Sequence, residues 1–417
     1  MGTVTVSGAH GQTVTLNFDS QSNAALARQL ASAITAGVQN GSIIPSVDTD
    51  GPPPVLPPGT TGEFVQTLTG STILPHGYNA FVNTAPNVVV FGSGDEDETV
   101  LSSTSNMDFI ATGGSGTVVA GGGNNRVVIP GTDDGDWSIN TGNGNDNVLA
   151  SGGGNDTISA GGGHNRLELG SGKDFITATG DDLIVAGTGQ ETVTAFGDAS
   201  TQVFGNASDL FFVGNGGSAT IFGGTGSDTY FGGHGPDYVQ GGSGGHNFLM
   251  GGSGAATLVG GGDGDILKAG IDSSGQVLRA GAGNETLEGG FGSDTFFGGG
   301  SGSATQIIGG GGNDTFVSAG GNATVTGGKA SDLFVFVKSN PGGTEVIQNF
   351  VSGMDQIGLE GFKGNEVARA LKSQQVADGN DTITLSDHTK VTFVGVTNLA
   401  ENDFTTIGGK QNFTPHS

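Results

Sequence analysis

Acidic residues recur at one fixed place in a glycine-rich phrase of this sequence. The phrase GGTGSDTYF (223–231) is followed directly by GGHGPDYVQ (232–240), and both carry aspartate as the sixth residue. Carboxylate and backbone carbonyl oxygens are the ligands that Ca²⁺ prefers, whereas zinc requires nitrogen or sulfur and magnesium a strict octahedron. Glycine lets the backbone adopt positive φ and stack closely. The phrase therefore indicates a calcium-binding turn.

Copies of this phrase fill most of the region from Val88 to Val337. Glycine accounts for 84 of the 417 residues, but 12 prolines are too few for collagen and 24 phenylalanines too many for a disordered chain. A register of mostly nine residues indicates a repeat architecture. Clear copies span residues 142–150, 170–178, 187–195, 223–231, 232–240, 281–289, 290–298 and 309–317.

We call the place of this acidic residue, the fifth or sixth residue of each copy, the acid position and take its carboxylates as the candidate metal ligands. These are Asp146, Asp156, Asp174, Asp182, Glu191, Asp209, Asp228, Asp237, Asp265, Glu285, Asp294, Asp314 and Asp332. Between Asn165 and Gln276, alternate copies have mostly lost the carboxylate. We expect alternate copies to lie on opposite edges, so that one edge binds most of the calcium. The alternative is that these carboxylates are solvated turn residues.

The second residue after each acid position is apolar or aromatic from Val148 to Phe334, including Phe211 and Phe248. Side chains alternate between the two faces of a strand, so this residue is expected to face inward from a short strand that follows a glycine-rich turn. Two copies then form one coil, and the coils stack as parallel strands. The sequence therefore predicts an all-β solenoid.

The flanking segments have a different composition. At the start of residues 1–48, apolar and polar residues alternate on both sides of a glycine-containing turn, which predicts a β-hairpin. Leu26, Leu30, Ile34 and Val38 then follow at intervals of four, which predicts an amphipathic helix. We interpret this small α+β module as a packing or capping unit, with docking or self-association as the alternative. The expected domains are the module at 1–48, a proline-rich linker at 49–62, a segment leading into the solenoid at 63–87, the solenoid at 88–337 and a β-rich C-terminal cap at 338–417.

The repeated phrase resembles the G-G-x-G-x-D-x-U-x repeat of RTX proteins. The resemblance implies a right-handed parallel β-roll, several Ca²⁺ ions as cofactors, and metal binding coupled to folding. Residues 331–361 resemble the segment that closes the roll in RTX proteins exported by type I secretion, and 388–408 resemble their C-terminal export signal. The resemblance therefore implies passage through a channel in the unfolded state, with the type I secretion machinery as a partner. The alternative is that the tail is only a β-rich cap.

Charge and motif content narrow the function classes. There are 40 acidic and 13 basic residues, a formal net charge of −27, which disfavours nucleic acid and anionic membranes as partners. No apolar run is long enough to span a membrane, and the first residues do not resemble a Sec-type signal. None of the seven histidines has H-E-x-x-H spacing, and GGSGG (241–245) matches G-x-S-x-G only inside the repeats. We predict that the protein is not an enzyme.

These observations favour a secreted, extracellular calcium-binding structural protein. We expect it to self-assemble into a surface layer, matrix fibre or biofilm scaffold, with copies of itself as partners. The first alternative is an adhesin or polysaccharide-binding module whose partner is a cell-surface polysaccharide. The second is a polysaccharide-active solenoid enzyme or its accessory subunit.

Overall fold

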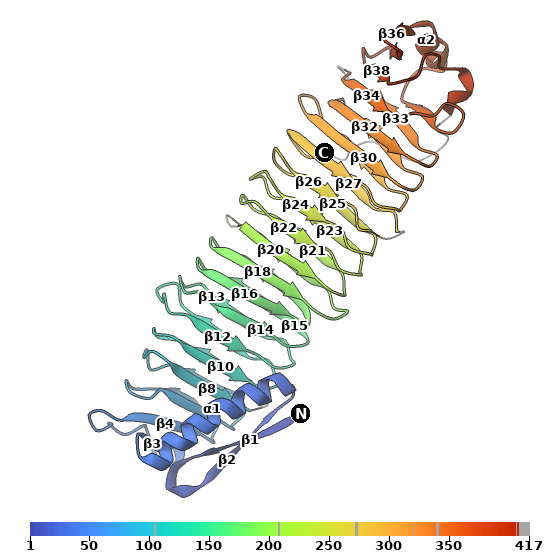
Figure 1. Ribbon diagram of the computed structural model, residues 1–417. Helices are drawn as coiled ribbons and strands as arrows, with labels where there is room; N and C mark the ends of the chain where they lie inside the picture. Colours follow the sequence, from blue (N-terminus) through green and yellow to red (C-terminus); the bar gives the residue numbers. More distant parts are fainter. Residues whose placement is uncertain are drawn as a thin grey trace. The chain divides into compact units, whose positions relative to one another are not determined.

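The computed structural model describes residues 1–103, 106–206, 209–271, 274–318, 320–338, 342–405 and 407. The described chain is mostly strand and forms a parallel β-solenoid of about 16 turns, with two helices, which confirms the predicted fold (Figure 1). It divides into two compact units, Met1–Phe211 and Phe212–Ser417. In the described residues, no helix is both long and apolar enough to cross a bilayer.

Consecutive strands in each unit alternate between two parallel sheets. In the first unit, sheet 1 contains β3 (Ile43–Val47), β4 (Thr61–Gln66), β6 (Ala80–Asn83), β8 (Glu98–Ser102), β10 (Gly116–Ala120), β12 (Trp137–Asn140), β14 (Thr157–Ala160), β16 (Lys173–Ala178) and β18 (Gln190–Ala195). Sheet 2 contains β5 (Ser71–Ile73), β7 (Val88–Phe91), β9 (Met107–Ile110), β11 (Arg126–Ile129), β13 (Asn147–Ala150), β15 (His164–Leu169), β17 (Asp181–Val185) and β19 (Thr201–Phe204). Strand β20 (Asp209–Gly214) follows them.

The second unit repeats this arrangement. Its sheet 1 contains β22 (Thr229–Phe231), β24 (Phe248–Met250), β26 (Ile266–Lys268), β28 (Asn284–Glu288), β30 (Ala304–Gly310), β32 (Asn322–Gly328) and β34 (Thr344–Gln348). Its sheet 2 contains β21 (Ala219–Phe222), β23 (Asp237–Gln240), β25 (Ala256–Val259), β27 (Val277–Arg279), β29 (Thr295–Phe297), β31 (Thr315–Ser318), β33 (Leu333–Val337), β35 (Gln356–Glu360) and β39 (Phe404–Thr405).

The register places equivalent residues of successive coils on top of one another. Ile158 of β14 pairs with Ile176 of β16, and Val148 of β13 pairs with Leu167 of β15. Each pair joins strands that are two repeats apart, so the predicted coil of two repeats is confirmed. The central inward residues form the core. Phe316 stacks between Phe296 and Phe334, with ring centroids 5.1 and 5.0 Å away.

Truncating this aromatic stack should destabilise the second unit. Phe316 is 3% exposed, so Phe316→Ala is expected to lower the free energy of unfolding by about 3–5 kcal/mol, because it leaves a cavity. Urea denaturation in calcium-containing buffer measures the loss. Phe291, which is 73% exposed, provides the matched control, and Phe291→Ala should change stability by no more than about 0.5 kcal/mol. Equal losses in the two variants would contradict the assignment of Phe316 to the core.

The sequence prediction of inward residues is wrong at two places. Phe211 is 41% exposed and Phe248 is half-buried, whereas Phe212 and Leu249 are fully buried. The turn before Leu249 holds an extra residue, and His246 accommodates it with a φ of 58°. Because side chains alternate along a strand, a shift of one residue exchanges the inward and outward faces.

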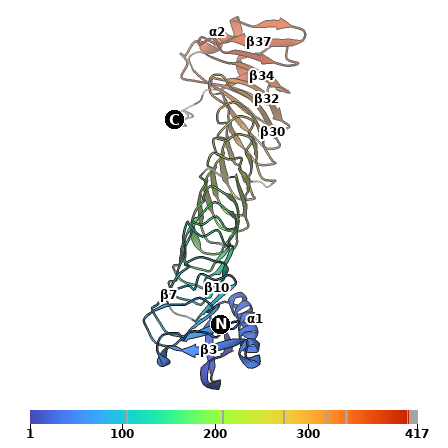
Figure 2. The ribbon, with the colours of Figure 1, turned by 90° about the vertical axis from the view of Figure 1, so that its left-hand side faces the viewer.

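The N-terminal module covers the outer face of sheet 1 in the first unit (Figures 1 and 2). It consists of an antiparallel hairpin, β1 (Gly2–Ser7) and β2 (Thr13–Phe18), and helix α1 (Gln21–Asn40). The hydroxyl of Ser20 accepts the N–H of Asn23 at 3.0 Å and caps the helix. The buried side of α1 is made mainly of alanines, and only Ile34 of the four predicted stripe residues is fully buried. Small side chains let the helix approach the sheet closely.

Parallel pairing begins earlier than the recognisable repeats. Strand β3 pairs with β4, and β4 pairs with β6, so residues 43–83 already belong to the ladder that we expected from residue 88. The proline-rich residues 52–58 connect the paired strands β3 and β4 as a loop. Strand β4 lacks an alternating pattern because the N-terminal module covers its outer face. The five-part domain division itself stays a prediction.

The C-terminal end of the second unit changes from repeats to a small mixed structure. Strand β34 pairs in parallel with β38 (Lys390–Phe393), which continues antiparallel to β37 (Asn380–Thr384) and then β36 (Gln375–Ala377). Helix α2 (Glu366–Lys372) precedes these strands. This is the β-rich cap expected from the sequence. Residues 408–417, where the predicted export-signal segment ends, lie outside the described residues.

Candidate metal sites

The acid positions face the interior of the turns. With one exception, the predicted ligands are almost completely buried; Asp156 and Asp174 are 1% exposed and Asp265 is 0% exposed. They alternate between the sheets as expected: Asp156 precedes β14 of sheet 1, and Asp146 precedes β13 of sheet 2. Solvated turn carboxylates would be exposed, so this geometry disfavours the alternative. The expectation that one edge binds most of the calcium stays a prediction.

In several turns one oxygen of the buried carboxylate joins two neighbouring coils. Asp174 Oδ1 accepts the backbone N–H of Asp156 at 2.9 Å. In the same way Asp314 Oδ1 accepts the N–H of Asp294 at 2.8 Å, and Asp332 Oδ1 that of Asp314 at 3.0 Å. An acid position on one coil thus satisfies the backbone of the equivalent position one coil earlier. These bonds run along the stack and hold the turns in register.

The second oxygen has two kinds of environment. In some turns a backbone N–H of the same turn donates to it, as Gly261 does to Asp265 Oδ2 at 2.7 Å and Gly290 to Asp294 Oδ2 at 3.0 Å. Elsewhere it is buried with no hydrogen-bond partner among the described residues. These atoms include Asp146 Oδ2, Asp174 Oδ2, Glu285 Oε1 and Asp314 Oδ2. A buried carboxylate oxygen without a partner is costly unless a cation binds it.

Burial changes the protonation of these carboxyl groups. Burial first, and then the charge of neighbouring carboxylates, raises the pKa of Asp314 to about 8 and those of Asp156 and Glu285 to about 7. Burial also raises the pKa of Asp146, Asp182 and Asp332 to about 6. Near neutral pH such rows of stacked carboxyl groups need either protons or a cation to offset their mutual repulsion.

The glycines of the turns let the carbonyl oxygens of one coil lie directly against the backbone of the next. A Cβ atom on Gly172 would overlap the carbonyl oxygen of Gly154, and one on Gly189 would overlap that of Gly172. Any side chain here would force the coils apart. In the part of the chain that the structure describes, no three His, Cys, Asp or Glu side chains come close enough to hold a metal by themselves. Carboxylate and carbonyl oxygens together form the donor set, which fits Ca²⁺.

Asp209 is the predicted ligand that the structure does not place with the others. Its side chain is exposed, and Leu210, which is 2% exposed, occupies the inward position instead. The sequence register is off by one residue at this repeat, so the prediction of Asp209 as an inward ligand is wrong. A similar shift puts the buried Asn247, rather than His246, at the acid position, where its Oδ1 accepts the N–H of Asp228 at 2.8 Å.

Several residues at the acid position escaped the sequence prediction. They are Glu98, Asn125, Asn247, Glu345 and Asp355, all almost fully buried. Asp355 accepts the N–H of Asp332 at 3.0 Å and that of Val351 at 2.8 Å, like the acids of the repeats. A weak signal was present for Glu98, since GSGDEDETV (92–100) is the repeated phrase with two extra residues before its acid.

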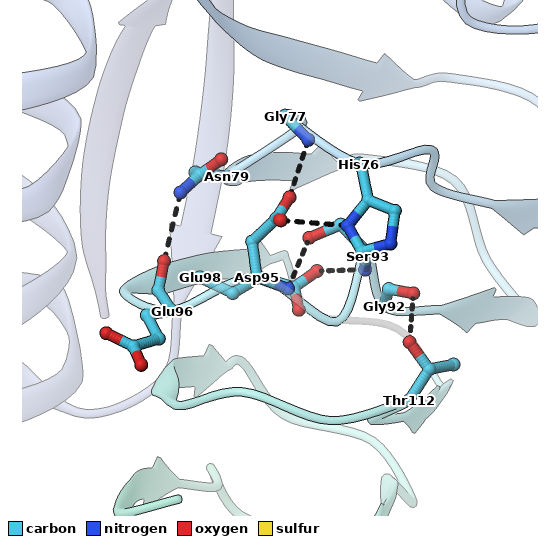
Figure 3. A network of polar contacts seen from close by, with 9 residues as sticks. All are labelled: His76, Gly77, Asn79, Gly92, Ser93, Asp95, Glu96, Glu98 and Thr112. Atoms are coloured by element: carbon cyan, nitrogen blue, oxygen red, sulfur yellow. Dashed lines mark hydrogen bonds and ion pairs between the residues drawn. The ribbon is translucent and has the colours of Figure 1, made fainter.

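The turn of Glu98 is shown in Figure 3. Glu98 Oε1 accepts the N–H of Ser93 at 3.2 Å, and a Cβ on Gly92 would lie 2.7 Å from Glu98 Oε2. Burial raises the pKa of Glu98 to about 7. The exposed side of this turn holds Asp95, which accepts the N–H of Gly77 at 2.5 Å and contacts His76 Nδ1 at 3.0 Å. A buried acid in a glycine-containing turn thus already occurs at Glu98, before the clear copies of the repeat begin.

Stacked glycine turns with inward carboxylates and adjacent carbonyls define a calcium-binding repeat solenoid. The family model of the RTX calcium-binding nonapeptide repeat matches the chain in four copies, at residues 141–176, 213–245, 279–301 and 306–325. The chain therefore contains RTX calcium-binding repeats, and these repeats together with the β-solenoid fit an RTX β-roll protein. Its several repeats imply several Ca²⁺ ions. The comparison with curated proteins returned no match. RTX repeat proteins are typically exported and extracellular, and the repeats themselves are typically non-catalytic.

The buried carboxylates and turn carbonyls would hold the calcium ions. When bound, the ions supply positive charge that neutralises the stacked acids. The chain contributes two further effects: the Oδ1 bonds align successive coils, and the glycines keep the turns close enough to share ligands. We therefore expect binding and folding of the repeats to be coupled.

Proposed function

We propose that this protein is secreted, folds when it meets external calcium, and assembles with copies of itself into an extracellular layer, fibre or scaffold. The observation that carries the proposal is the row of buried carboxylates whose second oxygens have no partner among the described residues, as at Asp174 and Asp314. A chain with this interior remains unfolded where calcium is scarce and folds where it is abundant. That behaviour suits export through a type I channel, which the resemblance of residues 388–408 to an export signal also supports.

Self-assembly is supported by apolar side chains on the outer faces of the sheets. Phe175 is 55% exposed on sheet 1 in the first unit, and Tyr238 is 39% exposed on sheet 2 in the second. Tyr238 lies beside Phe222, with ring centroids 5.8 Å apart. Exposed aromatic rings favour contacts between copies once calcium offsets the net charge of −27.

The same aromatic rings favour polysaccharide binding as the second candidate. A pair such as Phe222 and Tyr238 offers an apolar surface to the face of a sugar ring. In that case the protein would act as an adhesin on a cell-surface polysaccharide, and it would not need to polymerise. We propose no catalytic role for either candidate.

A calcium titration of the pure protein distinguishes these functions. We expect light scattering to rise on addition of calcium and electron microscopy to show filaments or sheets, with no rise on addition of magnesium. Monodisperse monomers at high protein and calcium concentrations would overturn self-assembly. Retention on a polysaccharide matrix without polymerisation would favour the adhesin. The variant Tyr238→Ser should reduce the rise in light scattering if the exposed rings join copies of the protein, or the retention on polysaccharide if they bind sugar.

A further inference from the structure

Asp19 connects the N-terminal module to the turns of the solenoid. It follows β2, outside the repeats, and its Oδ2 accepts the backbone N–H of Asn143 at 2.6 Å. A Cβ on Gly122 would lie 2.8 Å from Asp19 Oδ2, and one on Gly142 would lie 2.6 Å from Asp19 Oδ1. Both carboxylate oxygens therefore lie against two successive turns of the first unit.

Asp146 lies on the inner side of the same turns. It is 2% exposed, and its Oδ1 accepts the N–H of Asn125 at 2.7 Å. The side-chain amide of Asn125 donates both to Asp146 Oδ1 and to the carbonyl oxygen of Gly121, each at 3.1 Å. A Cβ on Gly142 would lie 2.5 Å from this carbonyl oxygen and 2.6 Å from Asp19 Oδ1. The Gly121 carbonyl oxygen thus lies next to Asp19 across Gly142, and the Asn125 amide links it to Asp146.

Each of the two acids has one carboxylate oxygen without a hydrogen-bond donor among the described residues. Asp19 Oδ1 and Asp146 Oδ2 are both buried, and neither has a hydrogen-bond partner among the described residues. Asp19 is near enough to Asp146 for the two negative charges to interact. Two close carboxylates without a cation repel each other, and no basic side chain in residues 1–103 and 106–206 forms an ion pair with either.

We propose that a calcium ion binds between Asp19, Asp146 and the carbonyl oxygens of the adjoining turns, and that it ties the N-terminal module to the solenoid. The inference rests on calcium binding by the repeats and does not depend on secretion or assembly. Asp19 supplies a ligand from outside the repeats, so the ion joins two structures that are separate in sequence.

Other contacts hold the module in place without the ion. Asn23 Nδ2 donates to the carbonyl oxygens of Ala120 at 3.1 Å and Thr141 at 2.9 Å. The module also shares a hydrophobic core with the outer face of sheet 1. Variant Asp19→Asn should therefore remain folded in calcium, which makes ion counting a fair test.

The test counts bound calcium by equilibrium dialysis at saturation, with titration calorimetry for the affinities. Asp19→Asn is expected to bind one ion fewer than the parent chain, or to bind that ion at least tenfold more weakly. Asp198→Asn, which removes one exposed carboxylate from the same unit, should bind as many ions as the parent. Asp146→Asn and the double variant Asp19→Asn/Asp146→Asn should each lose the same single ion.

Two outcomes would overturn the proposal. One is an unchanged ion count and unchanged affinities in Asp19→Asn. The other is loss of two ions in the double variant, since the two acids would then serve different sites. Hydrogen exchange in calcium gives an independent readout, because amide protection of residues 17–24 should fall in Asp19→Asn and stay unchanged in Asp198→Asn. Failure of assembly in the light-scattering experiment would leave all these results unaffected.

Discussion

Removal of calcium is expected to abolish most of the β-strand signal of this protein. The turns contain stacked, buried carboxylates such as Asp156 and Asp174, and glycine turns supply little apolar surface to hold them together. At a calcium concentration about 100-fold above Kd, each bound ion contributes about 2.7 kcal/mol to stability. Several ions thus match the total stability of a typical domain, about 5–15 kcal/mol. Without them the folded state should no longer be favoured at neutral pH.

Far-ultraviolet circular dichroism with a calcium chelator measures this effect. The spectrum should change from strand to coil, and excess calcium should restore it. Magnesium at the same concentration serves as the control, because its strict octahedral shell does not suit these turns. A chelated sample that kept its strand content and melting temperature would contradict the assignment of the acid positions as calcium ligands.

The fold could be predicted because one short pattern dictates it many times. An inward acid and an inward apolar residue two places later specify the strand face, and stacking of residues such as Ile158 on Ile176 follows from repetition. The prediction failed where a turn gained a residue. Near Phe248 the sequence fits the repeat in two registers that differ by one residue. Only the backbone conformation at His246 shows which of the two the chain adopts.

The placement of the N-terminal module could not be predicted from the sequence. The hydrogen bond between Asp19 and Asn143 joins residues that are 124 positions apart, and nothing local marks either as a contact residue. Strand β4 illustrates the same limit. Its residues Glu63 and Val65 face outward, and they are buried only because the hairpin and helix cover them. Tertiary contacts thus decide what the local pattern leaves open.

Acid should partly replace calcium in the folding of this protein. Burial raises the pKa of Asp314 to about 8 and that of Glu285 to about 7, whereas an unfolded carboxyl group titrates near about 4. Between these values the folded chain holds protons that the unfolded chain has lost, so the stability of the calcium-free protein falls as pH rises. Each such group changes the free energy of unfolding by about 1.4 kcal/mol for each unit by which its pKa is shifted. In calcium-depleted buffer the strand signal in circular dichroism should therefore be stronger at pH 5.5 than at pH 8. A strand signal that rose with pH would contradict this.

Variant Asp314→Asn separates the two roles of the buried acid. Asparagine fits the acid position, because Asn247 occupies an equivalent one and accepts the backbone N–H of the preceding coil at 2.8 Å. The variant removes a negative charge that otherwise has to be neutralised by a proton or a cation. It should therefore be more stable than the parent in calcium-free buffer at pH 8, by at least about 1.4 kcal/mol, the value of one pKa unit. In saturating calcium the order should reverse, because the variant has lost a ligand. The residual strand signal in circular dichroism measures the order in calcium-free buffer, and urea denaturation measures it in saturating calcium. The same order in both would show that Asp314 does not bind calcium.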